Sequence, residues 1–255
     1  MTASSPSPER VRGFTLVEIA IAIFIITILL GSILVPLTTQ VEQRQVSETQ
    51  KMLEDIKEAL IGHAVAKGYL PCPDRTSGGV GTANDTANDG VEDYNTGTGA
   101  CFSATATGNV PWVTLGLGAS DSWGNRFRYR VHSNYAQRSP AALFNLSSLT
   151  NLAVTATSGG TLLTAASPDG AVAVIISHGK NGFGAICAVC NPPNTARPAP
   201  TSAGEVDNIP GGSASSFTSR TITPVGSTAG EFDDIVVWVG KYTLFNRMVA
   251  AGKLP

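Results

Sequence analysis

The chain has 255 residues, a formal net charge of −2, and charged residues that make up 14% of the sequence. These charges are scattered, which argues against a nucleic-acid-binding surface. The length allows a membrane anchor and one sizeable domain. The 27 glycines and 15 prolines are concentrated after Gly68 and indicate a loop-rich β domain.

The first feature along the chain is an apolar run, residues 14–37, which follows a polar leader, residues 1–13. A membrane-spanning helix needs about 20 mostly apolar residues, and this run is long enough. No Ala-x-Ala cleavage site follows it, so the sequence predicts a retained anchor. Because Arg10 and Arg12 precede the run, the positive-inside rule places residues 1–13 in the cytoplasm and the rest of the chain outside it.

Glu18 lies near the start of this apolar run. A carboxylate at the centre of a bilayer costs about 2.5–3.5 kcal/mol on insertion scales, so its presence predicts a partner that matters for function. The alternative is a plain single-pass anchor in which Glu18 lies at the headgroup boundary, where its charge costs little.

Residues 13–18, Gly-Phe-Thr-Leu-Val-Glu, open an apolar helix and resemble the class III signal of type IV pilins and type II secretion pseudopilins. The resemblance implies cleavage between Gly13 and Phe14 by a prepilin peptidase and N-methylation of the new Phe14 amine. It also implies that Glu18 meets the N-terminal amine of a neighbouring subunit during assembly. Such a pair is physically reasonable, because a carboxylate and an ammonium neutralise each other in a low dielectric.

The chain turns polar after residue 37 but keeps a helical pattern. One apolar stripe recurs at spacings of three, four and seven: Val46, Leu53, Ile56, Leu60 and Ala64. Gly68 and Pro71 then provide a stop. The sequence therefore predicts one helix over about residues 15–67, roughly 80 Å long at 1.5 Å per residue. Its second half, residues 38–67, is amphipathic.

The remaining residues, 68–255, are expected to form a β-rich domain. Short apolar or alternating segments occur at 110–115, 126–131, 152–155, 171–176 and 235–239. In 126–131, Phe127, Tyr129 and Val131 share one face and three arginines share the other. The segments 171–176 and 235–239 are apolar enough for central strands, and 241–251 is a candidate final helix.

The predicted fold is α+β and pilin-like: a long N-terminal helix, half membrane-spanning and half amphipathic, packed on an antiparallel β-sheet. The fold has four parts: the leader 1–13, the span 14–37, the amphipathic half 38–67 and the globular domain 68–255. Two long loops, 74–108 and 186–218, are rich in small and polar residues. Loops of this length are usually functional or disordered.

The chain has four cysteines, all on the non-cytoplasmic side of the predicted anchor, where disulfides form. The Cys187-Ala-Val-Cys190 spacing fits half a zinc site, a redox pair or a small structural loop. Four cysteines allow three connectivities. We favour Cys72–Cys101 and Cys187–Cys190, which would each close a long loop.

Two later segments, 177–184 and 232–238, resemble pieces of major pseudopilins that carry oxygen ligands for calcium. Mapped onto this chain, the ligand positions are Asn181 and Asp234, with Asp233 as a neighbour able to substitute. The insertion between the two segments contains further oxygen donors, namely Glu205, Asp207 and Asn208. The alternative is that the aspartates cap a turn and start a strand. The acidic stretch 84–93 fails the EF-hand pattern and reads as a solvated turn.

These features together predict a structural subunit, minor or specialised, of a type II secretion pseudopilus or a type IV pilus. Expected partners are other subunits, prepilin peptidase, an inner-membrane assembly platform and membrane lipid, with no nucleic acid. The expected location is the inner membrane with the C-terminal domain in the periplasm, followed by a periplasmic or surface fibre. No cofactor is required, calcium is optional, and the sequence has no catalytic grouping. The alternative is a membrane-tethered periplasmic binding or adhesion protein that does not polymerise.

Overall fold

The computed structural model describes residues 13–77, 86–102, 107–139, 143–209 and 215–254, without the side chains of 30–37. The leader arginines Arg10 and Arg12 lie outside the described residues. The chain forms two compact units, residues 1–44 and 45–255.

The first unit consists of the beginning of helix α1 (Leu16–Lys67), close to the predicted start at residue 15. Its described apolar side chains are exposed, among them Ile19, Phe24 and Leu29, which are 49%, 66% and 56% exposed. None of the helices, as far as their residues are described, is both long and apolar enough to cross a membrane. The last part of the predicted span, residues 30–37, lies outside the described side chains.

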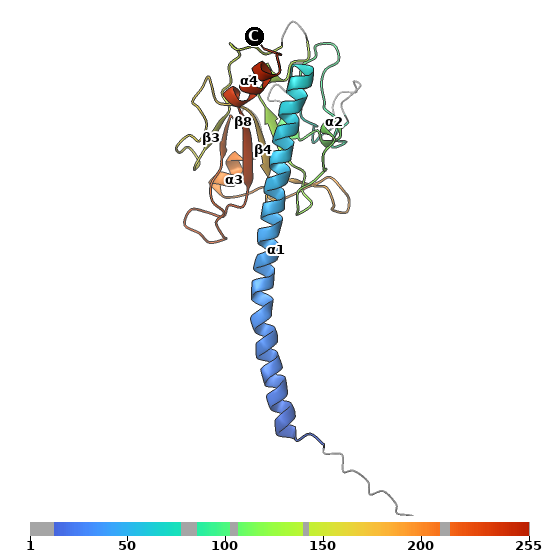
Figure 1. Cartoon of the computed structure of the whole chain (residues 1–255), viewed down its shortest axis with the longest axis vertical. Coiled ribbons are helices and arrows are strands. Elements are labelled where there is room, and N and C mark those ends of the chain that lie inside the picture. The colour runs from blue at the N-terminus through green and yellow to red at the C-terminus, as the bar shows by residue number, and fades with distance from the viewer. Residues whose placement is uncertain (1–12, 78–85, 103–106, 140–142, 210–214, 255) are drawn as a thin grey trace, which may run out of the picture. The chain divides into compact units, whose positions relative to one another are not determined.

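The second unit is built on a four-stranded sheet in which every neighbouring pair is antiparallel, as predicted (Figure 1). Its order is β1 (Thr107–Asn109), β2 (Arg128–Val131), β4 (Ala171–Ser177) and β8 (Ile235–Gly240). Three predicted strand segments therefore fall in one sheet, and segments far apart in the chain are neighbours in it.

One face of this sheet carries the main core. Residues of α1 and of α4 (Lys241–Ala250) pack against Tyr129 and Ile175 of the sheet. The helical members of this core include Leu53, Ile56, Leu60, Ala64, Leu244, Phe245 and Met248. The predicted stripe of α1 is thus confirmed from Leu53 to Ala64, whereas Val46 is only half-buried.

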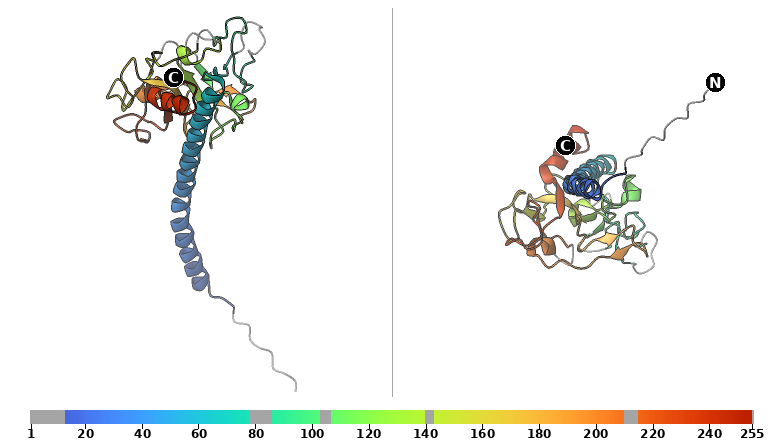
Figure 2. Two further views of the ribbon diagram at one scale, coloured as in Figure 1. Left: turned by 45° about the horizontal axis from the view of Figure 1, so that its top comes forward. Right: turned by 90° about the horizontal axis from the view of Figure 1, so that it is seen from below.

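The other face of the sheet is covered by a second, smaller apolar cluster. It joins Val174 and Ile176 of β4 to Phe217 of β7 (Ser216–Thr218) and Val154 of β3 (Ala153–Thr155). Strands β3 and β7 pair in parallel as a separate two-stranded sheet. Figure 2 shows α4 and the end of α1 on one side of the main sheet and loops and short strands on the other.

Two sequence predictions about these elements were wrong. Residues 110–115 do not form a strand: Trp112–Leu115 is the short helix α2, which ends at Gly116 in the left-handed conformation with φ 70°. The segment 235–239 is a strand, but β8 lies at the edge of the sheet rather than in its centre.

The long loops contain small elements of their own. These are η1 (Ser133–Tyr135), β5 (Ile186–Cys187), β6 (Thr195–Ala196) and α3 (Ala203–Asp207). Both favoured disulfides are present, Cys72–Cys101 and Cys187–Cys190. Each closes part of one of the two long loops.

Replacing Leu53 by Ala should destabilise the second unit, because Leu53 is 0% exposed in the core between α1 and the sheet. We expect a loss of about 2–5 kcal/mol in the free energy of unfolding, measured by urea denaturation of the full chain. The exposed Lys51→Ala, on the same helix, should change it by less than about 0.5 kcal/mol. A Leu53→Ala loss below about 1 kcal/mol would contradict the packing described.

Candidate functional site

The predicted processing site precedes the first turn of α1. Gly13 and Phe14 are both exposed, and the Phe14 side chain is 83% exposed. A Cβ added at Gly13 would meet no atom within 4 Å. The fold of this chain therefore gives no steric reason for a glycine at position 13.

Glu18 has a partner within its own chain that sequence reasoning missed. Its Oε2 accepts hydrogen bonds from the backbone N and from Oγ1 of Thr15, each at 2.9 Å. The Thr15 Oγ1 in turn accepts a hydrogen bond from the Glu18 backbone N at 3.2 Å. This reciprocal pair is a capping box, and the Thr-x-x-Glu spacing ahead of an apolar run is its sequence signal.

A second candidate site is an acidic cluster at the start of β8. Asp233 and Asp234 directly precede this strand, Glu205 lies on α3, and Asn181 lies in the turn that follows β4. One carboxylate oxygen of each of the three acids lies within 4.8 Å of the other two. The structure thus brings together the three predicted calcium residues and adds Glu205 from the insertion.

Asn181 holds two of these carboxylates in place. Its backbone N donates to Asp233 Oδ2 at 2.7 Å, and its Nδ2 donates to Glu205 Oε1 at 3.0 Å. Its Oδ1 accepts from the Phe183 backbone N at 2.9 Å. Asn181 therefore contacts the cluster through its two nitrogens, as a hydrogen-bond donor, while its side-chain carbonyl oxygen accepts from Phe183.

Asp234 is 3% exposed and is held from two sides. Its Oδ1 lies 3.2 Å from His178 Nδ1, and its Oδ2 accepts from Asn208 Nδ2 at 2.8 Å. His178 was not predicted as part of any site, although it follows β4 directly. Asp207, the other acid of the insertion that the sequence predicted as an oxygen donor, accepts a hydrogen bond from Thr218 Oγ1 outside the cluster.

The cluster concentrates negative charge in a poorly hydrated place. Burial, together with the nearby carboxylates, raises the pKa of Asp233 to about 7, and burial also raises the pKa of Glu205. Asp233 Oδ1 is buried and has no hydrogen-bond partner among the described residues. Gly179 keeps this region closely packed, because a Cβ there would collide with the Asp233 backbone oxygen. Such an arrangement can be neutralised by a proton or by a cation.

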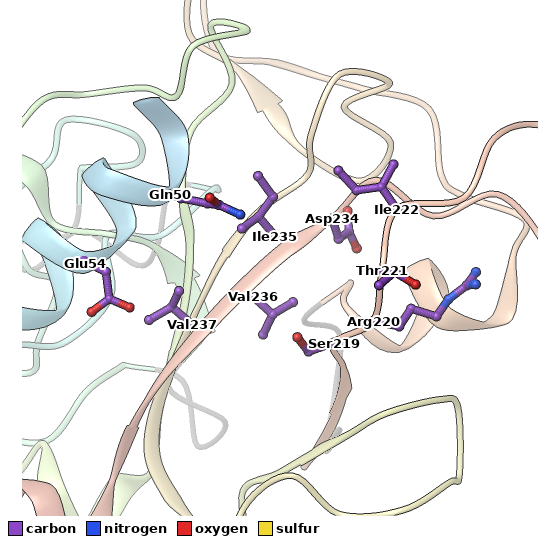
Figure 3. Close-up of a pocket in the computed structure, with 10 residues that line it drawn as sticks. All are labelled: Gln50, Glu54, Ser219, Arg220, Thr221, Ile222, Asp234, Ile235, Val236 and Val237. Carbon is purple, nitrogen blue, oxygen red and sulfur yellow. The ribbon is translucent and has the colours of Figure 1, made fainter. Parts of the chain in front are cut away.

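A groove of about 620 Å³ runs beside the edge strand β8 (Figure 3). Strand residues Ile235, Val236 and Val237 line it, with Gln50 and Glu54 of α1 on one side and residues 219–222 on the other.

The polar groups of this groove are largely engaged within the chain. Asp234 is bonded as described above, and Arg220 Nη2 donates to the backbone oxygens of Ala229 and Gly230. The groove therefore presents an apolar strand edge rather than a convergent set of reactive groups.

Asp74 is a buried carboxylate that sequence reasoning did not single out. Its Oδ1 accepts from the Asn88 backbone N at 2.9 Å, and its Oδ2 accepts from the Gly90 backbone N at 3.0 Å. It thus fixes the end of the acidic stretch 84–93, of which residues 84 and 85 lie outside the described part. Burial, offset only in part by these bonds, raises the pKa of Asp74 to about 7.

Asp74 should make stability depend on pH. Because its pKa is about 7 in the folded chain and about 3.9 when unfolded, the folded chain binds more protons between these values. Stability should therefore fall as pH rises from about 4 to 7, and Asp74 contributes at most about 1.4 kcal/mol per pH unit to this fall. Urea unfolding at several pH values measures this slope. Asp74→Asn should reduce this slope and the exposed control Asp55→Asn should not; an unchanged slope in Asp74→Asn would contradict the assignment.

Comparison with known proteins bears on the first of these sites. Residues 10–34 match the family model of the prokaryotic N-terminal methylation motif, which includes Gly13, Phe14 and Glu18. A search of curated proteins and a search of solved structures found no match. The chain carries the type IV pilin and pseudopilin signature, which implies processing by prepilin peptidase, a membrane-anchored precursor and a structural rather than an enzymatic role.

Proposed function

We propose that this chain is a structural subunit, minor or specialised, of a type II secretion pseudopilus or a type IV pilus. The observation that carries the proposal is the methylation motif at the start of a helix whose apolar side chains are exposed from Leu16 to Leu29. Exposed apolar surface of this extent needs lipid or other helices to cover it. Lipid would cover it in the inner-membrane precursor, and neighbouring subunits would cover it in the fibre.

The proposed assembly step pairs the Phe14 amine of one subunit with Glu18 of another. The capping box uses Glu18 Oε2, and no hydrogen bond within the described part of the chain reaches Oε1. One oxygen can therefore start the helix while the other receives an ammonium. The open space around Gly13 supports peptidase recognition as the reason for the glycine. The assembly platform in the inner membrane would then extract the processed subunit.

The variant Glu18→Gln separates the two proposed roles of this residue, capping of the helix and pairing with the Phe14 amine. A glutamine still completes a capping box, so the helix should form, but it carries no charge to pair with an amine. We expect normal membrane insertion and processing, and loss of fibre incorporation by at least about tenfold, measured by shearing and immunoblotting. Glu18→Ala should behave in the same way.

Thr15→Val is the matched control, because it removes the cap hydroxyl and keeps the carboxylate; it should still assemble. Normal assembly of Glu18→Gln would refute the charge pairing.

A cysteine at the exposed Val41 distinguishes a fibre from the alternative, a membrane-tethered periplasmic protein that does not polymerise. Crosslinked ladders support the fibre, and monomers alone support the tethered protein.

We further propose that the cluster of Glu205, Asp233 and Asp234 binds calcium. Three converging carboxylates, one with a buried oxygen that lacks a hydrogen-bond partner among the described residues, suit a cation that takes six to eight oxygens. Asn181 would orient two of the carboxylates, and waters or backbone carbonyls would supply the other ligands. Bound calcium would join the insertion, the turn after β4 and the start of β8.

Chelation should therefore destabilise the full chain. We expect EDTA to lower the thermal midpoint by about 3–5 °C, and calcium to restore it better than magnesium, which demands a stricter octahedral geometry. Asp233→Asn should remove the response, whereas Asp55→Asn, the same change at an exposed position of α1, should keep it. An unchanged midpoint on chelation of the wild-type protein would exclude the calcium site.

A further inference from the structure

Strand β2 and the segment directly before it carry three buried arginines. Arg126, Arg128 and Arg130 are only 9%, 7% and 9% exposed. The alternating pattern of the sequence places them on the face opposite Tyr129 and Val131, and those two residues belong to the main core. A row of guanidinium groups inside a folded domain needs an explanation, because buried charges are normally paired.

The strand register shows what lies beside these arginines. Arg128 stands between Asn109 of β1 and Ile176 of β4, and Arg130 stands between Thr107 and Val174. Side chains of directly paired residues share one face of a sheet. Ile176 and Val174 belong to the smaller apolar cluster. The two arginines therefore have a polar side chain on one flank and apolar packing on the other.

The guanidinium of Arg126 is held by hydrogen bonds and by an aromatic ring of the same chain. Its Nη1 donates to the Ala119 backbone oxygen at 2.9 Å, and its Nη2 donates to Asn194 Oδ1 at 3.0 Å. Its guanidinium carbon also lies 3.9 Å from the ring centroid of Trp112. Nothing further is required to account for its burial.

Arg128 and Arg130 are different. Arg128 Nη1 makes one long hydrogen bond, 3.4 Å, to Asn109 Oδ1, and Arg130 Nη1 makes one to Thr107 Oγ1 at 2.6 Å. The Nε of each is buried without a hydrogen-bond partner in the described part of the chain. No ion pair joins either residue to a described carboxylate. Each guanidinium has five N–H donors, so most of them make no hydrogen bond to the described residues.

Two unpaired cations at this depth are costly. Burial alone lowers the pKa of Arg128 to about 10 and also lowers the pKa of Arg130, with no acidic neighbour to oppose it. The two residues are two positions apart on one strand, so their Cα atoms are separated by about 6.6 Å. Both groups stay charged at neutral pH, and each adds to the need of the other for a counter-charge.

We propose that Arg128 and Arg130 together bind one tetrahedral oxyanion of the phosphate or sulfate class. Such an ion offers several oxygens to two planar forks and can bridge side chains at this spacing. Asn109 and Thr107 hold one nitrogen of each fork, which leaves the remaining donors for the ligand. This site lies outside the assembly helix and the acidic cluster, so it does not depend on the proposed function.

Inorganic phosphate tests the site directly. The full chain in detergent is titrated with phosphate by calorimetry, and its thermal midpoint is followed in phosphate and in chloride at equal ionic strength. We expect saturable binding of one phosphate per chain. We also expect the midpoint to rise by about 3 °C at ten times Kd, with no such rise in chloride.

The variant Arg128→Met should lose the phosphate response, because methionine keeps apolar volume and removes the fork. Arg247→Met, at an exposed arginine of α4, is the control and should keep it. If Arg128→Met does not fold, Arg130→Lys provides the second variant and should weaken phosphate binding at least tenfold. Equal effects of phosphate and chloride, or no calorimetric binding to the wild type, would overturn the proposal.

Discussion

The structure of the second unit depends on one contact, between the apolar stripe of α1 and one face of a four-stranded sheet. A small sheet with an uncovered apolar face is not stable on its own, and a helix with one apolar stripe needs a surface to bury it. Leu53 and Leu60 on the helix and Tyr129 on the sheet are all fully buried in this contact. The helix that carries the methylation motif is therefore also a core element of the globular unit.

Periodicity predicted these elements well, because each signal is local. The stripe of α1 and the alternation around Tyr129 follow from the helix and strand repeats. The errors came from signals that periodicity does not contain. Apolar content does not distinguish a central strand from an edge strand, so β8 was misplaced in the sheet. The short helix α2, between Pro111 and Gly116, was not predicted, because a brief apolar run fits a strand as well as a helix.

The acidic cluster shows a different limit of sequence reasoning. Asn181 and Asp233 are 52 residues apart, and only the pairing of β4 with β8 brings them together. A family resemblance could name these residues, but it could not show that Asn181 contacts the cluster through nitrogen. The role of His178 depends on the rotation of a buried ring toward Asp234, which no sequence spacing encodes.

Buried charge has different consequences for the acids and for the arginines of this fold. A carboxyl group such as Asp74, with a pKa raised to about 7, can take up a proton and become neutral near physiological pH. A guanidinium cannot do so, since even a pKa lowered to about 10 keeps Arg128 charged. The acids can therefore be accommodated by protons or by a cation, whereas the counter-charge that we propose for Arg128 and Arg130 is an anion. The two kinds of buried charge around one sheet would therefore be neutralised by ions of opposite sign.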